Sequence, residues 1–173
     1  MGPILSAMDL PLVEGAMKHR ILLVLVLVFS ALQVQAAGAR EQVGITLDAF
    51  HAAAADASER RYFDLMIEDV VFLGTDGTER WQGQAFRDFV SGHFSKGRGW
   101  SYRTTQRNIA VAPDGQSAWF DELLENEHLG QCRGSGTLLL TGQGWKIAQY
   151  NLSMPVPNNM AGQLAAKIRG EKE

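Results

Sequence analysis

Asp121 is the residue whose type and surroundings best suit proton transfer. It lies in the stretch Ala118-Trp119-Phe120-Asp121-Glu122, which mixes aromatic and acidic residues. A carboxylate in an apolar pocket has its pKa raised by desolvation, and this suits a general acid or base. If the stretch is a strand, its side chains alternate between two faces, and we assign Trp119 and Asp121 to the inner face. Both faces mix apolar and acidic residues, so the opposite assignment would make Glu122 and Asn126 the inner candidates.

Three further polar side chains are expected near Asp121. Arg133 lies on the next predicted strand, where it would either form a structural ion pair with Asp121 or set the charge of a functional carboxylate. In the last predicted strand, alternation places Gln149 and Asn151 on the inner face. A buried amide without a partner costs about 1–3 kcal/mol, so these amides must bond each other, the backbone or a ligand.

Two aromatic residues with polar tips, Tyr62 and Trp81, are expected at the wall of the same pocket, although simple core packing would also explain them. His51 and His93 are isolated on predicted helices, and their spacing favours structural roles. Since no histidine and carboxylate spacing marks a metal site, we expect neither a metal ion nor a cofactor.

Composition excludes several other classes of function. The formal net charge is -3 with a pI near 5.8, and no basic stripe indicates a nucleic-acid surface. The single cysteine, Cys132, cannot form an internal disulfide or a multi-cysteine zinc site. It is expected to be a small buried residue on a strand rather than a nucleophile.

The N-terminus has the pattern of a secretory signal peptide. A basic stretch at residues 18–20 precedes an apolar core at residues 21–32 and the small residues Ala36 and Ala39. The core is shorter than the roughly 20 residues of a membrane span, so we expect cleavage after Ala36 or Ala39, no stable span in the mature protein, and a periplasmic or secreted location. Met17 would be the conventional start of such a leader.

The elements that must position these side chains follow from periodicity. Residues 46–57, 59–66 and 84–95 are predicted helices, with a short hairpin at residues 70–82 between the last two. Four long antiparallel strands then follow, joined by turns that contain glycine, and a short helix at residues 158–167 ends the pattern. The predicted strands are residues 100–111, 117–128, 132–141 and 145–152. This order indicates an α+β fold, and we divide the chain into a leader (1–39), one domain (40–157) and a short C-terminal helix and tail (158–173).

Five stretches, in three groups, resemble the SnoaL-like domain of the nuclear-transport-factor-2-like superfamily. They are residues 62–74 with Trp81-Gln82-Gly83, Ala118–Glu122 with Arg133–Gly136, and the last predicted strand, Gly144–Ser153. The resemblance covers about residues 45–157. It implies a cone-shaped, cystatin-like roll, in which helices pack on a curved, mainly antiparallel sheet around a pocket, and dimerisation through the exposed sheet face.

The catalytic set of the ketosteroid isomerases in this superfamily is not carried over. Phe50 stands where those enzymes carry a tyrosine, and Gly74-Thr75 stands where their base aspartate lies. The fold hosts many activities, so function has to be argued from the site.

From the sequence we expect an exported protein that binds a small apolar or amphipathic molecule in a hydrophobic pocket, and that forms a homodimer. The first alternative is a cofactor-independent proton-transfer enzyme of isomerase, cyclase or dehydratase type that uses Asp121. The second is a non-catalytic dimerisation module. A pocket that holds a free carboxylate would favour the enzyme, and one whose carboxylate is neutralised would favour the binder.

Overall fold

A computed structural model of the 173-residue chain describes residues 36–170. The chain divides into two compact units, Met1–Ala39 and Arg40–Glu173. The basic stretch and apolar core of the predicted leader lie outside the described residues. Among residues 36–170, no helix is long and apolar enough to cross a membrane.

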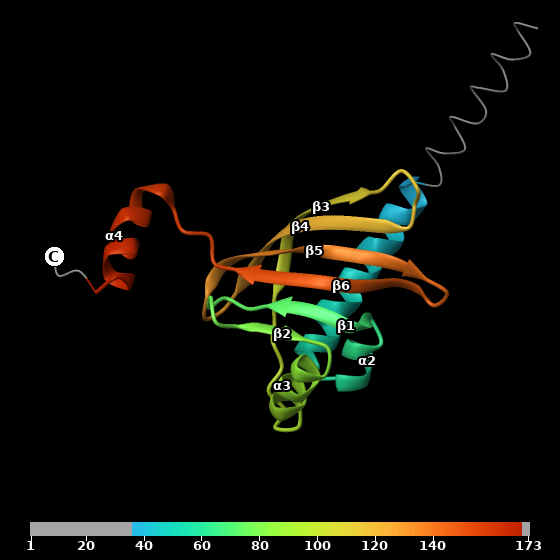
Figure 1. Cartoon of the computed structure of the whole chain (residues 1–173), viewed down its shortest axis with the longest axis horizontal. Coiled ribbons are helices and arrows are strands. Elements are labelled where there is room, and N and C mark those ends of the chain that lie inside the picture. Colours follow the sequence, from blue (N-terminus) through green and yellow to red (C-terminus); the bar gives the residue numbers. More distant parts are fainter. Residues whose placement is uncertain (1–35, 171–173) are drawn as a thin grey trace, which may run out of the picture. The chain divides into compact units, whose positions relative to one another are not determined.

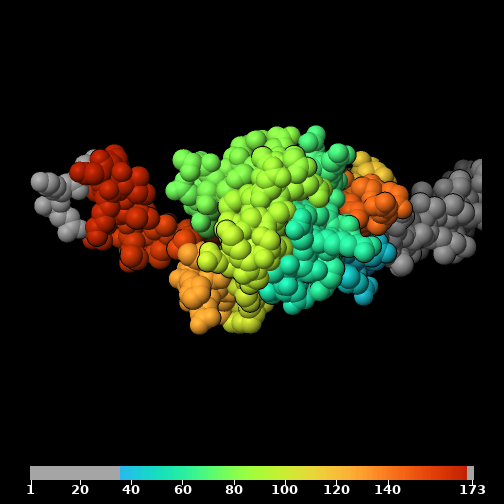
Figure 2. Space-filling model, turned by 90° about the horizontal axis from the view of Figure 1, so that it is seen from below, coloured from blue at the N-terminus to red at the C-terminus, as the bar shows by residue number. Residues whose placement is uncertain are grey.

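Three helices form one layer of the second unit. The first described helix covers residues 36–55, and it is followed by α2 (Glu59–Phe63) and α3 (Gln84–Phe94). On the first helix, Val43, Leu47, Phe50 and Ala54 recur at helical spacing and are all buried. The first helix lies across the sheet (Figure 1), and α2 and α3 lie side by side on one face of the unit (Figure 2).

Six strands form the second layer, in the order β2-β1-β6-β5-β4-β3. All neighbouring strands pair antiparallel except β1 and β6, which are parallel. The strands are β1 (Met66–Leu73), β2 (Arg80–Gln82), β3 (Arg103–Val111), β4 (Ser117–Asn126), β5 (Gly130–Thr141) and β6 (Gly144–Ser153). The predicted α+β fold with a mainly antiparallel sheet is therefore confirmed. The parallel pairing of β1 with β6 joins the predicted hairpin to the four predicted antiparallel strands.

A β-bulge in β6 changes which side chains point towards the helices. Ile147 pairs with Leu138 of β5, whereas Gln149 pairs with Thr137, so Ala148 is an extra residue in β6. The buried residues of β6 accordingly change from Trp145 and Ile147 before the bulge to Tyr150 and Leu152 after it. The bulge thus brings Tyr150 onto the inner face of the sheet.

The last helix, α4 (Asn158–Ile168), follows a short segment that contains Pro155 and Pro157. It has no buried residue, and Met160, Leu164 and Ile168 are all exposed on it. The core that shapes the site therefore lies between the first three helices and the sheet.

Candidate functional site

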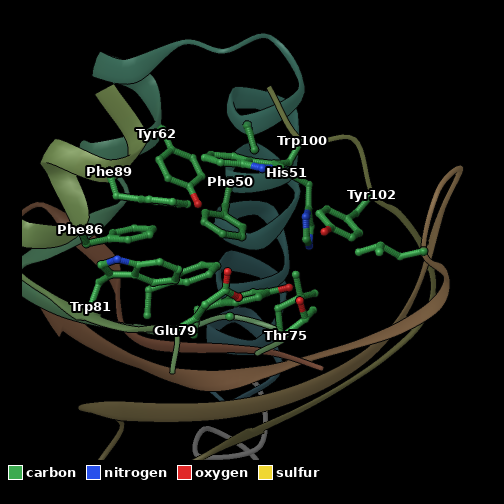
Figure 3. Close-up of a pocket in the computed structure, with 16 residues that line it drawn as sticks. Phe50, His51, Tyr62, Thr75, Glu79, Trp81, Phe86, Phe89, Trp100 and Tyr102 are labelled. Atoms are coloured by element: carbon green, nitrogen blue, oxygen red, sulfur yellow. The ribbon is translucent and has the colours of Figure 1, made fainter. Parts of the chain in front are cut away.

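A cavity of about 210 Å³ opens between the helices and the inner face of the sheet (Figure 3). Most of its wall is aromatic, and a smaller number of polar groups reach it. The rings are those of Phe50, Phe72, Trp81, Phe86, Phe89 and Trp100. The polar side chains are those of His51, Tyr62, Thr75, Glu79, Tyr102 and Tyr150.

The aromatic wall is built from stacked rings that come from different elements. Phe72 of β1 stacks on Phe86 of α3 with ring centroids 4.5 Å apart and planes 10° apart. On its other side, Phe72 lies 5.4 Å from the ring of Tyr150, again at 10°. Trp81 of β2 stacks on Phe89 of α3 at 4.3 Å. Aromatic pairs contribute about 0.5–1.5 kcal/mol beyond their buried area, so this wall is pre-formed.

Glu122 of β4 is a carboxylate on the inner face of the sheet, with 1% of its surface exposed. Its Oε1 lies 2.7 Å from Nε2 of His51 and accepts a hydrogen bond from the hydroxyl of Tyr150 at 3.0 Å. Its Oε2 accepts a hydrogen bond from Nε of Arg107 at 2.7 Å and a longer one from Thr104. Four donors from three other elements therefore compensate the burial of this carboxylate.

Arg107 of β3 connects this carboxylate to the surface of the first helix. Its Nη1 donates to Asp48 Oδ1 at 2.7 Å and to the carbonyl of Gly44 at 3.2 Å. The guanidinium is mostly buried, whereas the side chain of Asp48 is 71% exposed. The result is a chain of hydrogen-bonded ionisable groups, Asp48–Arg107–Glu122–His51, that ends at the cavity.

Gly134 of β5 makes room for these contacts. A Cβ at this position would lie 2.9 Å from Oε1 of Glu122 and would collide with the hydroxyl of Tyr150. Glu122 is the register partner of Gly134, so the missing side chain opens the space directly opposite the carboxylate. Glycine is therefore favoured at position 134 because a side chain there would overlap Tyr150 and Glu122 on the inner face of the sheet.

The electrostatics of the site follow from these contacts. Burial alone would raise the pKa of Glu122, but the hydrogen bond and charge of His51, together with Arg107, lower it below its ordinary value. The pKa of the Tyr150 hydroxyl is raised, first by burial and then by the charge of Glu122. Burial also raises the pKa of Tyr62, and it raises that of Tyr102 to about 12. At neutral pH Glu122 is thus a carboxylate, and the three tyrosines are protonated phenols.

Several polar atoms at the cavity have no hydrogen-bond partner among the described residues. Three of them are Nδ1 of His51 and the hydroxyls of Tyr62 and Tyr102. Every fully buried side-chain nitrogen or oxygen of residues 36–170 does have such a partner. These three atoms must therefore reach accessible space, and in Figure 3 the hydroxyl of Tyr62 points into the pocket.

The SnoaL-like domain family matches residues 43–157, most of the described chain. The chain belongs to the SnoaL-like domain family. No curated protein matches the sequence. Within residues 36–170 of this SnoaL-like protein, no group of three or more metal-ligating side chains could hold a metal ion.

Solved structures of the wider nuclear-transport-factor-2-like fold are similar to this SnoaL-like domain. A proposed dehydratase from Streptomyces avermitilis has 14% identity and a TM-score of 0.61, covering 70% of this chain and 99% of its own. A proposed aromatic ring hydroxylase from Novosphingobium aromaticivorans has 20% identity and a TM-score of 0.59, with coverages of 70% and 92%. A proposed ketosteroid isomerase from Shewanella frigidimarina has 17% identity and a TM-score of 0.52, with coverages of 67% and 98%. At these identities the likeness establishes the fold alone.

The SnoaL-like cavity contains only two of the predicted site residues, Tyr62 and Trp81. The inner-face assignment of Asp121 and Trp119 is wrong, because the inner face of β4 carries Ala118, Phe120 and Glu122. Asp121 is exposed and accepts a hydrogen bond from Asn108 at 3.0 Å. Trp119 is 52% exposed.

The predicted convergence of Arg133, Gln149 and Asn151 on the cavity is also wrong. Arg133 lies opposite Leu123 rather than Asp121, and it is exposed on the outer face of β5. The bulge at Ala148 shifts the alternation of β6 by one residue, so that Gln149 and Asn151 face outward.

The network around Glu122 was missed. From the sequence, Glu122 is expected on the inner face only if the opposite face of its strand points inward, and His51 is interpreted as structural. Two sequence signals pointed to them: the alternation of Ala118, Phe120 and Leu124 on one face of β4, and the position of His51 beside the apolar stripe of Leu47, Phe50 and Ala54.

Proposed function

We propose that this SnoaL-like protein is exported and binds a small, flat, largely apolar molecule in its aromatic cavity. The observation that carries the proposal is the pre-formed wall of stacked rings, which a few polar groups reach, among them the unpaired hydroxyls of Tyr62 and Tyr102. Small-molecule sites generally combine an apolar lining with a few placed polar groups. Two similar structures are described as a proposed aromatic ring hydroxylase and a proposed ketosteroid isomerase, and both descriptions refer to ring compounds.

The size of the cavity supports a ligand of one or two rings. Its volume of about 210 Å³ is smaller than the roughly 300–1,000 Å³ of pockets for drug-sized ligands. Glu122 lies behind the cavity wall and is paired with Arg107, whereas Glu79 lines the cavity and accepts a hydrogen bond from the backbone N–H of Asp76. The unpaired hydroxyls of Tyr62 and Tyr102 suit a ligand with an oxygen acceptor at its edge.

Calorimetry with 2-naphthol as a probe tests this function. We expect saturable binding with one site per chain. Thr75 lines the mouth of the cavity, so Thr75→Phe should weaken binding at least about tenfold, or ~1.4 kcal/mol. Gly77→Phe is the matched control in the same turn, because a side chain there meets open space. If 2-naphthol does not bind, or if both variants weaken binding equally, the cavity is not the site.

Export is supported by the leader pattern of residues 18–39. Intact-mass measurement of protein recovered from the periplasm or the medium should give a chain that begins at residue 37 or 40. A full-length mass, or retention of the protein in the cytoplasm, would contradict export.

Homodimerisation through the outer face of the sheet is part of the same proposal. Trp119 and Leu139 are 52% and 40% exposed there, next to Leu123 and Thr137. An antiparallel sheet that faces water on one side does not need large apolar side chains on that side. A second copy of the chain would cover them. Since Asp121 lies on this face, a catalytic role for Asp121 is not part of the proposal.

A further inference from the structure

We propose that His51 is a catalytic base in this cavity, and that it moves a proton between carbons of a flat carbonyl compound. This inference rests on the proposed binding function, because it uses the same cavity. It assigns to a histidine on the first helix the role that the sequence suggested for Asp121.

The protonation pattern of the His51 ring follows from its neighbours. Oε2 of Glu122 accepts a hydrogen bond from the guanidinium of Arg107, which is always charged, so Glu122 is a carboxylate and can only accept. Oε1 of the same group already accepts from the hydroxyl of Tyr150. The 2.7 Å contact with His51 must therefore be an Nε2–H donor bond. A neutral imidazole with its proton on Nε2 carries a free lone pair on Nδ1.

That lone pair is available to a ligand. His51 lines the cavity, and Nδ1 has no partner among the described residues. His93 provides a contrast within the same protein, since its Nδ1 lies 2.9 Å from the carbonyl oxygen of Phe89, one turn earlier on α3. His51 therefore has the two contacts that a general base needs: an orienting carboxylate on one nitrogen, and an open position at the other.

The cavity also supplies hydrogen-bond donors for the negative charge that such a reaction creates. The ring of Tyr102 lies 6.4 Å from that of His51 between centroids, and the two side chains are neighbours in Figure 3. Tyr102 and Tyr62 stay protonated at neutral pH, so their hydroxyls can donate to an oxygen that becomes anionic.

The step is balanced without any co-reactant. The C–H bond next to the carbonyl breaks, and its proton forms an N–H bond at Nδ1. The electron pair moves onto the carbonyl oxygen, giving an enolate that accepts a hydrogen bond from a tyrosine hydroxyl. The imidazolium is stabilised by Glu122 through the retained Nε2–H bond. Return of the proton to the same carbon gives exchange, and its return to a conjugated carbon gives isomerisation.

Arg107 and Asp48 are positioning residues in this scheme. They hold Glu122 as an anion, and Glu122 in turn fixes the ring orientation and tautomer of His51. Gln at position 122 could donate its amide to Nε2, and this would move the ring proton to Nδ1 and block the base.

The first experiment reads this tautomer directly, without any ligand. In ¹⁵N NMR of the full chain, we expect His51 to carry its proton on Nε2. Glu122→Gln should move the proton to Nδ1, whereas Tyr150→Phe should leave it on Nε2. A wild-type His51 with its proton on Nδ1 overturns the inference.

The second experiment measures proton transfer to a probe, 2-tetralone, a flat bicyclic ketone with an acidic C–H. We expect the protein to accelerate deuterium exchange at that carbon in D₂O, and His51→Gln to reduce the acceleration by at least about 100-fold. Gln can still donate to Glu122, so the fold is maintained. The matched control is Asp121→Asn, which changes the neighbouring carboxylate on the outer face and should leave exchange unchanged.

The outcomes separate the two proposals. Binding of 2-tetralone without accelerated exchange overturns the catalytic role and leaves the binding function standing. Neither binding nor exchange overturns both. Exchange that survives in His51→Gln also overturns the inference, because another group would then carry the proton.

Discussion

Nε2 of His51 lies 2.7 Å from Oε1 of Glu122, although the two residues are 71 positions apart in the chain. The contact joins the first helix to β4, the neighbour of the edge strand β3, and forms part of the cavity wall through His51. It replaces Asp121 as the centre of the chemistry that this SnoaL-like domain could perform.

Glu122→Gln should destabilise the protein strongly. The substitution leaves the mostly buried guanidinium of Arg107 with only the exposed Asp48 as a charge partner. Removing one member of a buried ion pair costs about 3–5 kcal/mol. Urea unfolding measures the free-energy change, and Asp121→Asn serves as the control on the neighbouring residue, with an expected change within about 0.5 kcal/mol. Equal effects of the two substitutions would contradict the buried network.

The same carboxylate makes stability depend on pH in the acid range. The pKa of Glu122 in the folded protein is lower than its ordinary value of 4.5. The folded state therefore binds a proton less readily than the unfolded state, and Glu122 stabilises the fold above pH 4.5. This contribution is lost as the pH falls below 4.5 and through the lower folded-state pKa. The difference in unfolding free energy between wild type and Glu122→Gln should shrink over that window, and a constant difference would be the contrary result.

Gly134→Ala should be destabilising by about 1–3 kcal/mol, because the added methyl group overpacks the space between Tyr150 and Glu122. Gly142→Ala is the matched control at the β5–β6 turn, where an added Cβ has no neighbour within 4 Å. Thermal unfolding compares the two variants. Similar melting temperatures would show that the inner face has more room than the structure gives it.

Trp119→Glu should convert the proposed dimer to a monomer, because it places a charge in the middle of the exposed outer face. Light scattering at tens of micromolar (an order-of-magnitude choice) reads the mass. Gln131→Glu adds the same charge at the exposed start of β5 and should leave the dimer intact. A monomeric wild type would exclude this assembly.

Most helices, strands and turns could be predicted because their signals are local, although the first helix is already formed at residue 36 rather than 46, and β1 begins at Met66 rather than Val70. Asp76-Gly77 and Pro113-Asp114-Gly115 mark turns, and the apolar stripe of Leu47, Phe50 and Ala54 marks the first helix. The predicted strands agree with β3 to β6 to within about three residues at each end, which is the usual uncertainty of element boundaries.

The site could not be predicted in the same way, because its geometry depends on non-local pairing. Both faces of β4 carry a large aromatic residue and an acid, Trp119 with Asp121 and Phe120 with Glu122, so alternation alone does not identify the inner face. The extra residue Ala148 has no distinctive type, and yet it reverses the faces of Gln149 and Tyr150. The partners of Glu122 come from the first helix, β3 and β6, and no spacing in the sequence brings them together.

Mapping of 2-naphthol binding by NMR tests the central claim, that the aromatic cavity is the ligand site. The account predicts that chemical shifts change at the side chains of Trp81, Trp100 and His51, which line the cavity, while the indole N–H of Trp119 on the outer face stays unchanged. Shifts centred on Trp119, with none at Trp81 or Trp100, would contradict it and place small-molecule binding on the outer face of the sheet.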